Sequence, residues 1–204
     1  RHLLRRNLGI KKIKVGHAGT LDPMATGLLI ICTGRATKTI TNLIGLDKEY
    51  TGTMFLGAVT PSFDTETEVS HTFKTSHITK NLIEQTANKL TGEIKQIPPV
   101  FSAIKIEGSR AYRFARKDKE VNIGPRIVTI VEFQILDFQL PEVHFRVLCS
   151  KGTYIRSLVN DFGKLLNSGA YLKTLRRTKI GSYDIEDAVT PDQFQIILNS
   201  LKQN

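Results

Sequence analysis

The stretch GHAGTLDPMATG, at residues 16–27, places one acid and one imidazole among three glycines and a proline. Pro23 fixes its own φ angle and pushes the preceding Asp22 toward an extended backbone. We therefore expect the Asp22 carboxylate to project from a stiff turn that leads into the apolar run at residues 28–32. An Asp-Pro pair also opens ordinary turns, in which the glycines serve only the bend. This stretch alone does not decide whether Asp22 is a functional carboxylate or only a turn residue.

A second stretch, CSKGTYIRSL at residues 149–158, has the pattern of a strand, a glycine turn and the start of a helix. Thr153 is the expected N-cap, which places Tyr154 and Arg156 in the first helical turn, beside the apolar stripe of the helix. An arginine at a helix N-terminus opposes the macrodipole, so Arg156 predicts a partner carboxylate or phosphate. A surface arginine with a solvated head is the alternative.

A third stretch, LKTLRRTK at residues 172–179, holds four cations that are interrupted by the apolar Leu175. Such a pattern can follow a phosphate backbone while it inserts a hydrophobic side chain. It is equally typical of an edge strand whose charges prevent aggregation. The stretch therefore predicts either a nucleic-acid contact or a protected strand.

Apolar periodicity predicts the remaining elements. Strands are expected at residues 28–32, 48–56, 100–106, 127–138 and 143–149, with the PPV stretch at 98–100 as a stiff connection into a core strand. Helices are expected at 1–8, 79–90, 111–117, 153–166 and 191–201, the last behind Thr190 as N-cap. Strands and helices mix without strict alternation, which favours a single α+β domain with a mixed, largely antiparallel sheet flanked by helices.

The amino-acid composition indicates what kind of molecule the protein binds. Among 204 residues, 29 Lys and Arg face 19 Asp and Glu, a net charge of +10, which suggests a polyanionic partner with nucleic acid as the leading candidate. Cys32 and Cys149 lack any CxxC spacing and are expected to be buried thiols rather than metal ligands. Without a membrane-spanning apolar stretch or a signal peptide, a cytoplasmic location is expected.

Four spaced segments together resemble the TruB family of tRNA pseudouridine(55) synthases, in the same order along the chain. They are GHAGTLDPMATGLLIICTGRATK, KEYTGTMFLGAVTPSFDTE, QIPPVFSAIKIEGSRAYRFAR and CSKGTYIRSL with LRRTKIG, and the coverage runs from about Val15 to Val189. The resemblance implies the pseudouridine synthase catalytic fold. It also implies isomerisation of one uridine, at position 55 in the T loop of tRNA, with the target base flipped out of its stack.

The resemblance assigns the catalytic roles to three residues. Asp22 takes the place of the catalytic aspartate, Arg156 that of the arginine that pairs with it, and Tyr50 that of the tyrosine that packs on the target base. Tyr50 is also a candidate for removing the C5 proton, although a phenol with a reference pKa of about 10 is a poor base. The set of substrate and RNA contacts implied in the same way is His17, Tyr50, Tyr154, Leu175, Lys38, Arg176 and Arg177.

The chain also departs from the family pattern. Arg35 stands where many relatives carry Glu, and Ile30 where many carry Pro. The strand that normally precedes the signature is absent, so we expect an upstream segment to be missing. No accessory RNA-binding PUA domain follows Val189, which predicts that tRNA affinity rests on one catalytic domain spanning residues 1–204.

The implied reaction needs few groups. It is an isomerisation without net transfer of electrons, so no cofactor and no metal are expected, and the chain carries no nucleotide-binding fingerprint. The expected partner is the T-stem-loop of tRNA, bound by a monomer without a guide RNA. A non-catalytic RNA-binding module, in which Asp22 is only a turn residue, is the rival interpretation.

Overall fold

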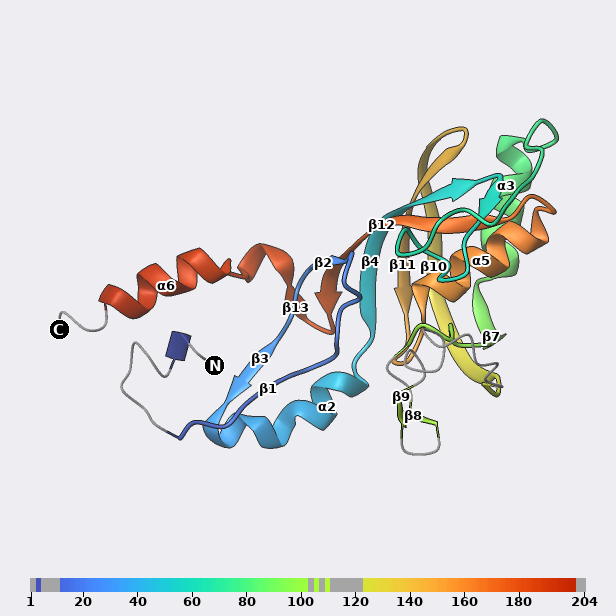
Figure 1. Cartoon of the computed structure of the whole chain (residues 1–204). Helices are drawn as coiled ribbons and strands as arrows, with labels where there is room; N and C mark the ends of the chain where they lie inside the picture. The colour runs from blue at the N-terminus through green and yellow to red at the C-terminus, as the bar shows by residue number, and fades with distance from the viewer. Residues whose placement is uncertain (1–2, 5–11, 103–104, 107–108, 111–122, 201–204) are drawn as a thin grey trace.

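The computed structural model describes residues 3–4, 12–102, 105–106, 109–110 and 123–200, and it is built around one seven-stranded sheet (Figure 1). Six strands follow the order β13-β12-β4-β11-β10-β7, all antiparallel, and β2 lies parallel to β12. Their bounds are β2 Thr26–Gly27, β4 Lys48–Leu56, β7 Gly92–Gln96, β10 Arg126–Gln139, β11 Glu142–Cys149, β12 Ala170–Ile180 and β13 Tyr183–Asp184.

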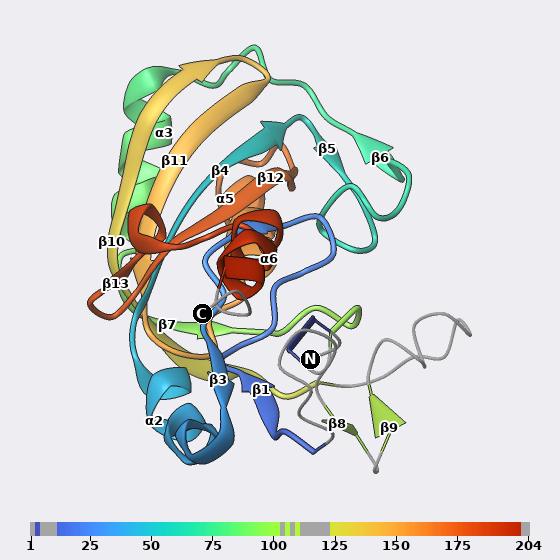
Figure 2. The same cartoon turned by 90° about the vertical axis from the view of Figure 1, so that its left-hand side faces the viewer.

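Smaller elements surround this sheet. Figure 2 shows the β1–β3 hairpin and α2 at one end of the sheet and the β5–β6 hairpin at the other. These elements and the remaining short ones are β1 Val15–His17, β3 Ile31–Thr33, η1 Gly34–Thr39, α2 Ile40–Gly45, β5 Ala58–Val59, β6 His71–Thr72, β8 Lys105–Ile106, β9 Ser109–Arg110 and η2 Ile185–Asp187. The expected α+β class with a mixed, largely antiparallel sheet is confirmed.

Two helices cover one face of the sheet. α3, Lys80–Lys89, packs on β10, and α5, Ile155–Leu165, packs on β12. The core forms between these helices and the inward residues of β11, where side chains alternate with period two, as in any half-buried strand. The largest fully buried apolar side chains there are Met54, Leu56, Ile83, Ile130, Phe145, Leu158, Phe162, Leu166 and Leu172.

The N-capping residues of three helices can be compared with the predicted ones. Thr79 caps α3 by accepting a hydrogen bond from Leu82 N, and Thr190 caps α6, Pro191–Ser200, by accepting one from Gln193 N, as expected. The prediction of Thr153 as the N-cap of α5 is wrong: its hydroxyl donates to Ser150 O, and Tyr154 is the capping residue.

Two predicted strands are also wrong in part. Strand structure in the first apolar run begins only at Ile31, because the preceding residues lie against β12 and Leu28 N donates to Arg177 O. The predicted strand at 100–106 is reduced to Lys105–Ile106, since residues 98–102 form an irregular segment. Strands β1, β2, β5, β6, β7, β9 and β13 were not expected. The helices predicted at 111–117 and, apart from residues 3–4, at 1–8 lie outside the described residues.

Both cysteines are free and buried, as expected. Burial raises the pKa of the Cys149 thiol to about 12, so this side chain stays protonated and unreactive near neutral pH. In the part of the chain that the structure describes, no helix is long and apolar enough to cross a membrane, and no group of three His, Cys, Asp or Glu side chains could hold a metal ion.

A glycine in the last turn of α5 sets how closely this helix approaches the sheet. A Cβ atom at Gly163 would lie 2.1 Å from the backbone nitrogen of Ala170, where β12 begins. We expect Gly163→Ala to lower the free energy of unfolding by about 1–3 kcal/mol, although alanine is the better helix former, because backbone atoms must move apart.

Thermal and urea unfolding would measure this change. Gly45→Ala is the matched control, since a Cβ there meets no atom within 4 Å. Equal stability of the two variants would contradict the close packing of α5 on β12.

Candidate functional site

The turn that carries Asp22 is held against β12 by a buried arginine. Arg177, only 1% exposed, donates from Nε to Leu28 O at 2.8 Å and from Nη2 to Gly19 O at 3.1 Å. Gly27 adopts a φ of 106°, and a Cβ atom there would lie 2.2 Å from Arg177 O. The two ends of the turn are therefore fixed to the sheet, and Asp22 lies between them.

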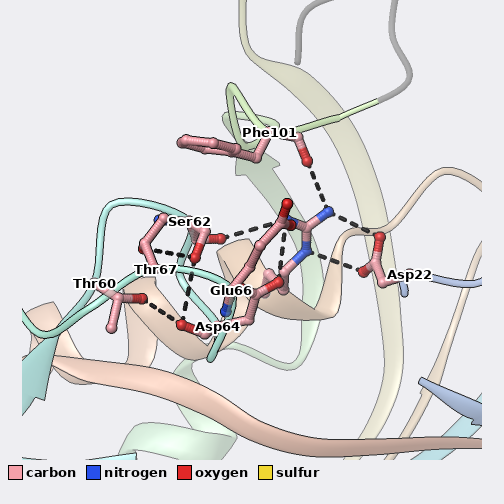
Figure 3. Close-up of polar contacts among 8 residues, drawn as sticks. Asp22, Thr60, Ser62, Asp64, Glu66, Thr67 and Phe101 are labelled. Carbon is pink, nitrogen blue, oxygen red and sulfur yellow. Dashed lines mark hydrogen bonds and ion pairs between the residues drawn. The ribbon is translucent and has the colours of Figure 1, made fainter. Parts of the chain in front are cut away.

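Asp22 is bound by a two-pronged ion pair. Arg156 donates from Nε to Oδ2 at 3.0 Å and from Nη2 to Oδ1 at 2.8 Å (Figure 3). This fork-to-fork geometry is the strongest arrangement available to an arginine and a carboxylate. The Arg156 side chain is 3% exposed, whereas that of Asp22 is 30% exposed. The expected partner carboxylate of Arg156 is thus Asp22, and the alternative of a solvated surface arginine is wrong.

Arg156 also binds a second carboxylate that sequence reasoning missed. Asp64, 1% exposed, places Oδ2 3.3 Å from Arg156 Nη1, and this oxygen accepts no hydrogen bond from the described residues. The loop around Asp64 is polar and tightly bonded, since its backbone oxygen accepts from Thr60 and Ser62. The only signal in the sequence was the unfavourable position of Arg156 at the start of a helix. This position predicts a partner carboxylate, but it does not show that there are two.

Two backbone oxygens complete the surroundings of the guanidinium. Ser62 O accepts from Nη1 at 3.3 Å and Phe101 O accepts from Nη2 at 2.9 Å. One buried cation is thereby bound by two carboxylates and two carbonyls that come from three separate chain segments, as Figure 3 shows. A buried charge requires such a complete set of partners.

The start of α5 is positioned by Gln96. This fully buried side chain accepts from Tyr154 N at 2.8 Å and donates to Tyr154 O at 3.1 Å. The amide therefore satisfies the backbone of the capping residue, two positions before Arg156. The Arg126 guanidinium lies over the Tyr154 ring, 5.3 Å from its centroid.

A cavity of about 670 Å³ opens in front of this ion pair. Its volume is in the range of ordinary ligand sites. It is lined by most of the residues singled out in the sequence, and among the lining side chains are Asp22, Lys48, Tyr50, Tyr154, Arg156, Leu175 and Arg177. The fold therefore brings residues from the signature turn, β4, α5 and β12 to one cavity.

Two ionisable side chains at this cavity have shifted pKa values. Burial raises the pKa of Tyr50 above its usual value of 10.0, and the nearby Arg177 opposes this shift. Burial, together with Arg177, lowers the pKa of Lys48. The Lys48 ammonium donates to Ile44 O and Leu46 O at 2.6 Å each, and so anchors the end of α2 beside the cavity.

Three predicted contact residues lie away from the cavity. His17 is exposed on β1, opposite Ile31, Lys38 is exposed at the end of η1, and Arg176 is exposed on β12. None of them lines the cavity, so their contacts with RNA stay predictions. Arg177 lies inside the protein and binds backbone oxygens, and a phosphate contact for it also stays a prediction.

Two family models match consecutive parts of the chain. The TruB family pseudouridylate synthase N-terminal domain matches residues 5–155, and the tRNA pseudouridylate synthase B C-terminal domain matches residues 156–204. The junction falls within the first turn of α5. Because β12 after the junction pairs with β4 before it, both matched parts contribute strands to one sheet.

Curated relatives resemble nearly the whole chain. The tRNA pseudouridine synthase B of Flavobacterium johnsoniae is 56% identical over 196 residues, which are 96% of this chain and 86% of the relative. The protein of the same name from Phocaeicola vulgatus is 52% identical over 194 residues, which are 95% of this chain and 83% of the relative.

Solved structures support the same fold. A chain in the crystal structure of a Cbf5-Nop10-Gar1 complex aligns with a TM-score of 0.73 and 26% identity over 99% of this chain. A chain in an H/ACA RNP bound to a substrate RNA containing 2'-deoxyuridine aligns with a TM-score of 0.70 and 25% identity. This protein spans about half the length of those two chains, 50% and 49%. With the family models and the close relatives, these likenesses confirm the predicted resemblance: the chain belongs to the TruB family of pseudouridylate synthases.

Proposed function

We propose that this chain converts one uridine of tRNA, at position 55 in the T loop, into pseudouridine. Family membership and the names of the curated relatives support this substrate. The reaction breaks the C1′–N1 bond of the nucleotide, turns the uracil, joins C5 to C1′ and releases the proton of C5. Because no electrons and no other atoms are exchanged, a positioned carboxylate and a closely fitting cavity are the main requirements.

The observation that carries the proposal is the unequal exposure of the two carboxylates on Arg156. The Asp22 side chain is 30% exposed and lines the cavity, whereas Asp64 is 1% exposed and does not line it. Of these two carboxylates, only Asp22 can therefore reach a bound nucleotide. The two-pronged bond to Arg156 restricts the orientation of the Asp22 carboxylate, which suits it to act on the sugar or the uracil ring.

The cavity walls suit a flipped base. Tyr50, Tyr154 and Leu175 offer flat or apolar surfaces on which a uracil can lie. Removing a base from its stack costs a few kcal/mol, and stacking on an aromatic side chain offsets roughly 1–3 kcal/mol of that cost. Since its pKa is raised, Tyr50 stays a neutral phenol near pH 7, which fits a packing surface better than the base that removes the C5 proton.

Exposed cations outside the cavity would hold the RNA backbone. Lys38 and Arg176, both exposed, would bind phosphates, and the net charge of +10 supports this role. In this proposal the enzyme acts as a monomer, since the catalytic carboxylate, its partner arginine and the cavity all come from one chain. The names of the curated relatives, all tRNA pseudouridine synthase B, support a cytoplasmic location and action without a guide RNA.

Asp22→Asn tests the catalytic carboxylate. We expect the variant to bind tRNA but to lose at least about 10³-fold in turnover, since an amide can neither attack nor accept a proton as a carboxylate does. The measurement is tritium release from tRNA transcript labelled at uracil C5. Asp192→Asn, an exposed acid at the start of α6, is the matched control and should retain full activity.

Substantial turnover by Asp22→Asn would contradict the assignment of Asp22 as the catalytic carboxylate. If the wild type bound tRNA without turnover, the interpretation as a non-catalytic RNA-binding module would be favoured.

Arg156→Lys tests the buried cation. Lysine keeps the charge but cannot bind Asp22 with two prongs while it also reaches Asp64 and the two carbonyls. We expect a loss of about 3–5 kcal/mol in the free energy of unfolding, since a buried carboxylate loses its partner, together with a loss of turnover.

Arg146→Lys is the control, because Arg146 pairs with Glu49 and Glu132 on the open face of the sheet with 28% of its side chain exposed. Surface pairs of that kind contribute about 0–1 kcal/mol, so equal effects of the two substitutions would argue against the central role of Arg156.

A further inference from the structure

A second cavity, of about 580 Å³, is lined by the same loop that carries Asp64. Ser62, Asp64 and Glu66 of this loop face Arg156 or the first cavity, whereas Thr60, Pro61 and Phe63 line the second. No residue lines both cavities. The loop therefore separates two hollow regions, and the second one is not part of the site described above.

An asparagine of α5 lines this second cavity. Asn160 follows Arg156 by four positions, so the two side chains lie on the same face of the helix, one turn apart. Asn160 is 5% exposed, and its side-chain amide, which forms no hydrogen bond with any residue that the structure describes, keeps contact with the solvent of the cavity. The two donors and the acceptor of this amide are therefore open to water or to a ligand that enters the cavity.

The hydroxyls next to Asn160 are already satisfied. Thr60 donates to Asp64 O at 2.7 Å, and Ser62 bonds to the hydroxyl of Thr67 at 2.8 Å. Ser168, which is fully buried, donates to Gly169 O at 3.1 Å. The Asn160 amide offers one acceptor and two donors to the cavity, and the exposed Asn167 amide, which also lines it, has no side-chain hydrogen bond with the described residues either.

Aromatic rings and a cation form the rest of the wall. Phe63 has a φ of 63°, a conformation that costs free energy for a residue with a Cβ, and functional sites often hold such residues. The Phe73 ring lies against Gly169, whose added Cβ would be 2.8 Å from Cε2. Lys164 lines the same cavity, and its ammonium is exposed near Asp161. Two rings, one amide and one ammonium thus meet at this cavity.

We propose that the second cavity binds a nucleobase. The face of the base would lie on Phe63 or Phe73, its polar edge would bond to the Asn160 amide, and Lys164 would meet the attached phosphate. Stacking on aromatic rings and hydrogen bonding of the base edge are the general means by which proteins hold unpaired bases. The base belongs either to a free mononucleotide or to an unpaired stretch of an RNA chain. The site does not depend on the proposed catalytic function, since it shares no lining residue with the first cavity.

Titration with AMP, GMP, CMP and UMP, followed in ¹⁵N–¹H spectra of the full chain, tests the site. We expect shifts in the side-chain amide signals of Asn160 and in the backbone signals of Ser70 and Gly169. The backbone signal of Gly152 reports binding in the first cavity instead. Asn160→Leu, which has nearly the same shape, should weaken binding at the second cavity by about tenfold or more, whereas Asn88→Leu, on the exposed side of α3, should not change it.

Thermal unfolding separates a ligand contact from a structural role. Because the Asn160 amide forms no hydrogen bond with the described residues, Asn160→Leu should unfold at the same or a higher temperature than the wild type. A clear decrease would mean that Asn160 stabilises the fold itself, and would overturn the proposal. Lys164→Gln provides a second variant, since this side chain is 68% exposed and its replacement leaves the packing intact. It should weaken the binding of nucleoside monophosphates but not of the corresponding nucleosides.

A parallel titration with unstructured oligoribonucleotides identifies the source of the base. Shifts at Asn160 and Gly169 with mononucleotides would assign the site to a free nucleotide, and shifts with the oligonucleotide alone would assign it to an RNA chain. If neither ligand moved these signals, or if Asn160→Leu left the affinities unchanged, the proposal would be wrong. Shifts confined to Gly152 would also overturn it, while leaving the catalytic cavity intact as a nucleotide site.

Discussion

The architecture of the site depends on the buried guanidinium of Arg156. Its partners come from the signature turn, from the loop that carries Asp64 and from the irregular segment that contains Phe101. None of these segments has regular structure of its own, and a buried cation is stable only when every donor has an oxygen to bind. The same requirement that neutralises Arg156 thus orders the three segments around the cavity, and places Asp22 at its edge.

Strand register determines which side chains of β12 reach the cavity. In the pairing of β12 with β4, Leu175 lies opposite Gly52 and Arg177 opposite Tyr50. Because side chains alternate between the faces of a strand, Leu175 and Arg177 are buried beside the cavity while Arg176 between them is exposed. Two adjacent arginines therefore have different surroundings: one binds the turn that carries Asp22, and the other remains available to a phosphate.

The two cavities along α5 have a common wall. Arg156 and Asn160 lie one turn apart on the helix, and the loop around Asp64 passes between the hollows that they face. Arg156 has bonds on all sides, whereas the amide of Asn160 has none among the described residues. One helix face therefore combines a polar group with a full set of partners, which fixes the turn that carries Asp22, with an amide whose hydrogen-bonding groups face a cavity.

Local patterns in the sequence were sufficient to predict the helices with capping residues and the alternating strands at 48–56 and 143–149. They also predicted the burial of both thiols and a carboxylate partner for Arg156. These features depend on neighbours within a few positions. The tertiary structure alone decided that Asp64 is a second partner, that Gln96 rather than Thr153 satisfies the start of α5, and that Arg177 lies inside. Such contacts join residues that are far apart in the chain; Arg156 and Asp22 are separated by 134 positions. These residues become buried together only once the sheet has formed.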